Sequence, residues 1–128
     1  MLLYMGNGTE WSAYQRERRV RHLTECAAAC GAAADQVHRR LDEVSDGESC
    51  GRLALALAAI GDCLEVCAAA ASLLARDGEL SRLAAGPCVE ACRRCAEACD
   101  ALSPENEAAE CARHCRRSME VCRSWAGL

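Results

Sequence analysis

The sequence predicts an all-α protein, an antiparallel up-down-up-down four-helix bundle with a cysteine-lined core. Three observations support this prediction. Ala, Leu, Arg and Glu dominate the 128 residues, β-branched residues are scarce and Phe is absent, so the local preference is helical almost everywhere. Apolar side chains recur at alternating steps of three and four, as in the seam of a bundle. Turn residues divide the chain into four long segments.

Turn and capping residues set the helix bounds after a flexible N-terminal tail, residues 1–10. The first helix is expected to end at the Ser-Asp-Gly turn at 45–47, and the second at the Asp-Gly pair at 77–78. Pro87 suits the first turn of a helix, and the Ser-Pro pair at 103–104 opens the last helix as N-cap and first residue. The four helices are predicted over residues 11–44, 49–76, 79–102 with a break near 86–87, and 104–125.

The apolar spacing of the first two helices predicts how they pack. Both helices repeat the alternating steps of three and four that mark a buried stripe. Short turns between long helices favour antiparallel neighbours. The stripe positions are Val20, Leu23, Ala27, Cys30, Ala34, Val37, Leu41 and Val44 in the first helix, and Leu53, Leu57, Ile60, Leu64, Cys67, Ala71 and Leu74 in the second.

Charge and composition exclude several classes of function. The net charge of -4 argues against a nucleic-acid-binding protein, whose domains are usually basic. The basic cluster at 16–21 contains Glu17 four residues before Arg21, where a helix would pair them on a solvated face. The sequence has no paired carboxylates, Ser/His/Asp set or phosphate-binding loop, so we do not expect an enzyme.

The N-terminal region lacks the features of an export signal. The apolar stretch from Met1 to Met5 is far shorter than a signal peptide requires. The pair Arg18 and Arg19 is followed by charged residues where a twin-arginine signal would be apolar. Charged residues also interrupt every stretch that approaches the roughly 18 apolar residues of a membrane span. We therefore expect a soluble cytoplasmic protein with reduced thiols and no membrane partner.

Twelve cysteines in so short a chain signal either a disulfide scaffold or a metal protein. Four of them recur at steps of four, three and four in the third helix, within an arc of roughly 60°. The fourth helix has three on a comparable arc, with Ser118 where another would lie. The first two helices each have an inward pair, and Cys50 is the outlier. The twelve are Cys26, Cys30, Cys50, Cys63, Cys67, Cys88, Cys92, Cys95, Cys99, Cys111, Cys115 and Cys122.

The rise of about 1.5 Å per residue gives each cysteine a depth in the bundle, counted from the end that holds Val44 and Ser103. We expect a dense thiol cluster in one half and a partly hydrophobic plug in the other. The first half would hold Cys26, Cys30, Cys63, Cys67, Cys88 and Cys122. The second would place Cys95, Cys99 and Cys111 against Val37, Leu41, Leu53 and Leu57.

Several explanations compete for these cysteines. Buried Cys can serve as a small hydrophobe, but aligned stripes on every helix exceed what packing requires. Disulfides within a helix would be strained, because positions i and i+4 hold their Cβ atoms about 5–6 Å apart, whereas disulfides between helices stay open. A thiol-redox regulator needs an exposed thiol of low pKa, and a copper chaperone or sensor usually holds one ion at an exposed site. Metal binding accounts for both the number and the alignment.

The type of ligand narrows the choice of metal ion. Dense thiolate with little imidazole or carboxylate selects soft ions, and copper(I) fits best. Zinc sites usually close one tetrahedron from two separated pairs, commonly on loops, although another thiolate metal such as zinc stays an alternative. An iron-sulfur cluster would use only four thiolates. Cys92 and Cys95 form a C-x-x-C, but Ala96 follows where attached haem requires His.

The segment C-V-E-A-C-R-R-C-A-E-A-C, from Cys88 to Cys99, resembles the bacterial four-helix-bundle copper storage proteins. The C-x-x-x-C pairs at 26/30, 63/67, 88/92, 95/99 and 111/115 are similar to theirs too, and the resemblance covers most of residues 20–125. It implies a cytosolic homotetramer of bundles whose twelve cysteines hold many copper(I) ions for detoxification or supply. Copper donors or chelators are the partners that it implies.

Departures from the family pattern lower the expected capacity. Ser118 breaks the fourth-helix motif C-x3-C-x2-C-x3-C, and Ala33 and Ala70 stand where thiol-richer members continue the stripe.

Trp11 and Trp125 are expected to pack near the sulfur-rich end. The candidate accessory metal ligands, each also suited to a surface or core-edge position, are His22, His38, His114 and Met119.

Overall fold

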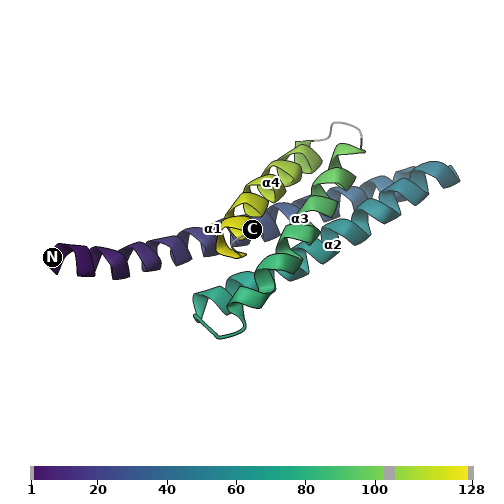
Figure 1. Cartoon of the computed structure of the whole chain (residues 1–128). Helices are drawn as coiled ribbons and strands as arrows, with labels where there is room; N and C mark the ends of the chain where they lie inside the picture. The colour runs from purple at the N-terminus through teal and green to yellow at the C-terminus, as the bar shows by residue number, and fades with distance from the viewer. Residues whose placement is uncertain (1, 103–105, 127–128) are drawn as a thin grey trace.

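The computed structural model describes residues 2–102 and 106–126, with side chains over 12–102 and 107–125. Within these ranges the chain is helical and has no strand, which confirms the all-α prediction (Figure 1). The elements are α1 (Leu2–Glu43), α2 (Gly47–Ala75), a 3-10 helix η1 (Ser81–Ala84), α3 (Ala85–Asp100) and α4 (Asn106–Ala126).

The observed helix bounds lie within two residues of the predicted ones except at the start of α1, and the third helix changes type earlier than expected. α1 begins at Leu2 rather than at Trp11. The early segment contains Gly6 and Gly8, and each glycine weakens a helix by about 1 kcal/mol without preventing it. The flexibility of residues 1–10 stays a prediction. η1 passes into α3 at Ala85, so the change of helix type precedes the break expected near 86–87. The capping roles predicted for residues 103–104 lie outside the described residues.

The α1 to α2 turn is fixed by a side-chain cap. Asp46 has extended backbone angles, and its carboxylate accepts a hydrogen bond of 2.8 Å from the backbone N–H of Ser49. This bond satisfies one of the donors that the first turn of a helix leaves without a partner. The same bond lowers the pKa of Asp46, because it stabilises the charged carboxylate. The start of the second helix therefore has a physical cause in the Asp46 side chain.

A left-handed residue ends α2. Asp77 has φ 54°, and its N–H donates to the carbonyl of Leu74 at 3.0 Å, while Gly78 N–H donates to that of Leu73 at 3.2 Å. These two bonds form a Schellman motif, in which the left-handed position usually holds glycine. The aspartate therefore occupies a backbone conformation that suits glycine better.

Asp77→Gly is expected to raise the free energy of unfolding by about 0.5–1 kcal/mol, because it relieves the left-handed strain. The ion pair that it removes, Arg16 to Asp77 at 3.6 Å, is solvent-exposed and is worth little. Asp77→Asn is the control, since asparagine tolerates the conformation but lacks the charge. Urea unfolding of both variants separates the two effects. A stabilisation of Asp77→Asn equal to that of Asp77→Gly would assign the gain to charge instead.

The four helices pack as a bundle in which α1 contacts α2 and α4, and α3 contacts α2 and α4. Along each of two neighbouring pairs, the order of the contacting cysteines runs in opposite directions. This is the order expected of antiparallel neighbours. The contacting pairs are Cys26–Cys115 and Cys30–Cys111 between α1 and α4, and Cys63–Cys92 and Cys67–Cys88 between α2 and α3.

The paired ends of α1 and α2 extend beyond the end of α3 and the start of α4, as Figure 1 shows. Cys30 lies thirteen residues before the end of α1, whereas Cys111, which it contacts, lies five residues after the start of α4. At about 1.5 Å per residue, the start of α4 therefore lies roughly 12 Å short of the end of α1. The bundle has four helices where the eleven buried cysteines lie and two at its protruding end, where Cys50 lies.

α2 is long and apolar enough, by length and composition, to cross a membrane. Its most apolar 18-residue window has a mean hydropathy of 1.9, and 33% of that window is buried. Asp62 and Glu65 interrupt the segment, and its buried residues form one wall of the bundle core. The core helix of a water-soluble bundle has the same composition, so length and composition alone do not distinguish a membrane span from a core helix. The absence of a membrane partner therefore stays a prediction.

Candidate metal centre

Eleven of the twelve cysteines point into the bundle and are buried, ten of them with no exposed surface and Cys99 with 4%. They occupy the inward positions that the spacing of three and four predicted. Cys50 is half-buried at the start of α2, and its thiol donates to the backbone carbonyl of Val44 at 4.0 Å. All twelve are free thiols.

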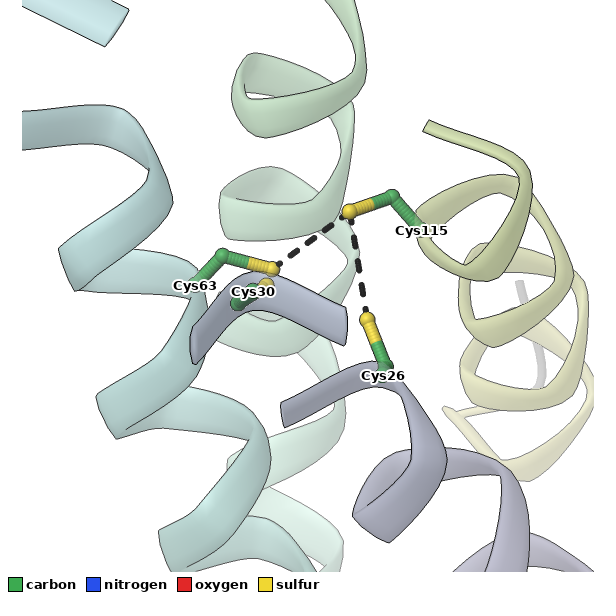
Figure 2. A group of neighbouring side chains, drawn as sticks. All are labelled: Cys26, Cys30, Cys63 and Cys115. Atoms are coloured by element: carbon green, nitrogen blue, oxygen red, sulfur yellow. Dashed lines mark hydrogen bonds between the residues drawn. The ribbon is translucent and has the colours of Figure 1, made fainter. Parts of the chain in front are cut away.

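Three groups of four buried cysteines converge so closely that each group could hold a metal ion. Within each group all sulfur atoms lie within 4.8 Å of one another. The groups are Cys26, Cys30, Cys63 and Cys115; Cys26, Cys63, Cys67 and Cys92; and Cys30, Cys95, Cys111 and Cys115. Figure 2 shows the first group, in which sulfur atoms from α1, α2 and α4 point toward one another. The groups share Cys26, Cys30, Cys63 and Cys115, so they form one continuous cluster.

The contacts between sulfur atoms form an unbroken path along the bundle. Cys111 donates to Cys30 at 3.6 Å, and at the centre Cys115 lies 3.8 Å from Cys26 and 3.7 Å from Cys63. Toward the other end the path continues over contacts of 3.6 to 3.7 Å. These link Cys63 to Cys92, Cys92 to Cys67, and Cys67 to Cys88. Cys122 lies near enough to Cys88 for the two thiols to shift each other's pKa.

The predicted division into a thiol half and a hydrophobic half is wrong for two cysteines. Cys95 and Cys111 lie 3.6 Å apart and belong to a metal-competent group with Cys30 and Cys115. The predicted depths require the end of α1 and the start of α4 to lie level, whereas α4 begins deeper in the bundle. A hydrophobic plug does exist beyond the cluster, formed by the buried Val37 and Leu53 and the partly buried Leu41 and Leu57.

The interior has almost no polarity apart from sulfur. Among the described side chains only two polar ones are buried, Ser81 and Ser118, and neither is charged. The hydrogen bond with Cys111, together with burial, raises the pKa of Cys99 to about 12. The hydrogen bond with Cys88 and burial likewise raise the pKa of Cys122. These two thiols are neutral at pH 7, so a metal must displace their protons.

The raised pKa of Cys99 predicts an alkaline limit to the stability of the metal-free protein. Because the folded pKa of about 12 exceeds the ordinary 9.0, this thiol stabilises the fold below about pH 9. The contribution is lost as pH rises toward 12, since the unfolded chain ionises first. Anaerobic urea unfolding should therefore show a constant free energy from about pH 6 to 8 and a fall above 9. A Cys99→Ala variant with an equally steep fall would remove Cys99 from this explanation.

The candidate accessory ligands lie in four different settings. His22 is half-buried, and its buried Nδ1 has no hydrogen-bond partner. His114 pairs with Glu110, with 3.3 Å from Nε2 to the carboxylate. His38 is exposed. Met119 packs partly against the core and lines a surface groove between α3 and α4. None of these four belongs to the three cysteine groups, so their role as ligands stays a prediction.

Three small residues occupy the inner wall among the cysteines. Ala33, Ala70 and Ser118 are fully buried, as expected of positions that continue the thiol stripes. The Ser118 hydroxyl donates to the backbone carbonyl of His22 at 3.4 Å. Trp125, near the C-terminal end of α4, packs against the core. The side chain of Trp11 lies outside the residues whose side chains the structure describes.

Comparison with known proteins agrees with this geometry. A family model described as copper storage protein (Csp) matches residues 12–127, nearly the whole chain. Neither a curated protein nor a solved structure matches the chain.

Proposed function

The chain belongs to the copper storage protein family, and from this membership we propose that it stores copper as many copper(I) ions bound to buried thiolates. The observation that supports the proposal most directly is the sharing of thiols among the three cysteine groups. Sulfur can bridge two metal ions, so shared cysteines suit a multi-ion cluster better than isolated sites. We propose as ligands the eleven buried cysteines, with Cys50 as an outlying twelfth.

Charge balance favours copper(I) over zinc in this interior. A zinc ion with four thiolates carries a net charge of -2, and the described core contains no cationic side chain to offset it. Burying an uncompensated charge is costly. Copper(I) and thiolate in a ratio of one to one form a neutral cluster. The expected capacity is therefore about one copper per buried thiol, with one proton released per ion.

Anaerobic titration with copper(I) against a competing chelator, read by native mass spectrometry, tests the proposal. We expect about eleven tightly bound ions and one proton per ion, with little change in helical circular dichroism. A stoichiometry near one would indicate a chaperone or sensor. Tighter binding of zinc than of copper(I), or few free thiols in denaturant without reductant, would contradict copper storage in favour of the two remaining alternatives.

Ser118→Cys is expected to raise the copper capacity by about one ion, because the buried side chain lies on the thiol-bearing face of α4. The substitution loses the hydroxyl bond to His22, which is worth about 1 kcal/mol. Ser118→Ala loses the same bond without adding a thiol and is the matched control. Native mass spectrometry of both variants after copper(I) loading measures the two capacities. Equal capacities would mean that position 118 does not face the cluster.

We also propose the assembly and location that the family resemblance implies. The chain is expected to act in the cytoplasm as a homotetramer that receives copper from donors or chelators and serves detoxification or supply. Sedimentation of the purified chain tests the assembly, and cell fractionation tests the location.

A further inference from the structure

A pocket of about 520 Å³ lies at the end of the bundle where α1, the α2 to η1 turn and the end of α4 meet. Three arginines line it, Arg16 and Arg19 from α1 and Arg82 from η1. The buried Ser81 and the indole of Trp125 also line the pocket. Because these residues come from separate elements, only the folded chain assembles the pocket.

The pocket is positively charged although the chain as a whole is acidic, with a net charge of -4. Asp77 is the one carboxylate among its lining residues, and it pairs with Arg16 at 3.6 Å. Within the described part of the chain, Arg19 and Arg82 have no carboxylate partner. On α3, by contrast, Arg93 is paired with both Glu90 and Glu97. The unbalanced guanidinium groups suit an anionic ligand.

The pocket adjoins the last thiol of the sulfur path. Trp125 follows Cys122 by about one helical turn on α4, and Arg19 lies close enough to Cys122 to interact with it electrostatically. From Cys122 the path runs through Cys88 to Cys67. The sulfur atoms of Cys88 and Cys67 lie 3.7 Å apart. Two residues of the pocket lining, Arg19 and Trp125, therefore lie beside Cys122.

We propose that this pocket receives copper(I) as an anionic complex with a small thiol that carries carboxylates, and passes the ion to Cys122. The inference rests on the proposed storage of copper(I). Three guanidinium groups would repel a bare cuprous cation, but they attract the carboxylates of such a carrier. Arginine binds carboxylates through paired hydrogen bonds, and this would hold the carrier against the end of the thiol path.

The transfer is a ligand exchange without oxidation or reduction. The bond between copper and the carrier sulfur breaks, and a bond between copper and the Cys122 sulfur forms. The Cys122 thiol proton moves to the carrier sulfur, which leaves as a neutral thiol group. Copper remains cuprous throughout. The same exchange then carries the ion from Cys122 to Cys88, since bridging thiolates allow one bond to form before another breaks.

Transfer rates from three small thiols that differ in charge test the proposal: mercaptosuccinate is anionic, 2-mercaptoethanol is neutral and cysteamine is cationic. At low salt the native chain should take copper from mercaptosuccinate about tenfold faster than from cysteamine. In the double variant Arg19→Gln and Arg82→Gln the difference should shrink to about twofold, and salt should have the same effect in the native chain. The control Arg94→Gln with Arg113→Gln makes the same change in net charge at exposed positions on α3 and α4.

Equal rates from the three thiols in the native chain, or an equal loss of preference in the control variant, would overturn the pocket proposal. Loading with the cuprous acetonitrile complex, which needs no anionic carrier, measures capacity separately and shows that each variant is folded. Native capacity with an altered rate order supports the proposal. A native chain that binds no copper from any donor would instead overturn the storage function.

Discussion

Replacing Cys63 and Cys115 together by alanine should disrupt all three metal-competent groups, because every group contains at least one of them. The expected loss of copper capacity is about twice that of a variant that lacks two peripheral thiols, since each central sulfur can bridge two ions. The control is Cys50→Ala with Cys99→Ala, whose residues belong to none of the groups. Both variants remove two of the twelve thiols, so they differ only in position.

Anaerobic titration with native mass spectrometry measures both capacities. Circular dichroism verifies that the apo variants keep their helices, because small cavities left by Cys→Ala cost only about 1 kcal/mol each. Equal losses in the two variants would show that the cysteines act as independent sites. That result would contradict a shared cluster while leaving copper binding itself intact.

Copper loading is expected to stabilise the fold by more than a typical core substitution destabilises it. A ligand that binds only the folded state at a hundredfold excess over its Kd contributes about 2.7 kcal/mol per site, so four such ions would contribute roughly 11 kcal/mol. For a domain of this size the unfolding midpoint should rise by tens of degrees. Anaerobic thermal unfolding of apo and loaded protein, followed by the helical signal, measures the shift.

Ile60→Ala provides a destabilised host for the same measurement. Ile60 is fully buried in the core, and its truncation should cost the apo protein about 2–5 kcal/mol. Copper should restore a midpoint above that of the native apo protein, because the sulfur cluster ties together all four helices. An unchanged midpoint on loading, in either chain, would mean that copper binds outside the bundle.

The sequence could predict the helices and the direction of the cysteines, because both depend on local periodicity. A stripe of Cys88, Cys92, Cys95 and Cys99 must face one side of any helix, and all four are buried. Relative depth was less predictable, since it depends on how far each hairpin extends. The erroneous placement of Cys95 and Cys111 followed from assuming that the two hairpins end together.

The arginine pocket lay beyond sequence reasoning for a different reason. Arg19 belongs to a basic segment whose sequence predicts a solvated helix face, and Arg82 stands alone in the sequence. Only the meeting of α1 with η1 places them around one cavity. A pattern in one segment cannot reveal a site that tertiary packing builds from several elements.

The small residues on the inner wall have an evolutionary consequence. Ala33, Ala70 and Ser118 are as fully buried as the thiols beside them, and Ala, Ser and Cys differ little in size. Exchanges among these three residue types should therefore be tolerated by the scaffold. Lineages could gain or lose storage capacity in single-residue steps, and related chains should diverge at inward positions mainly by interchange of cysteine, serine and alanine.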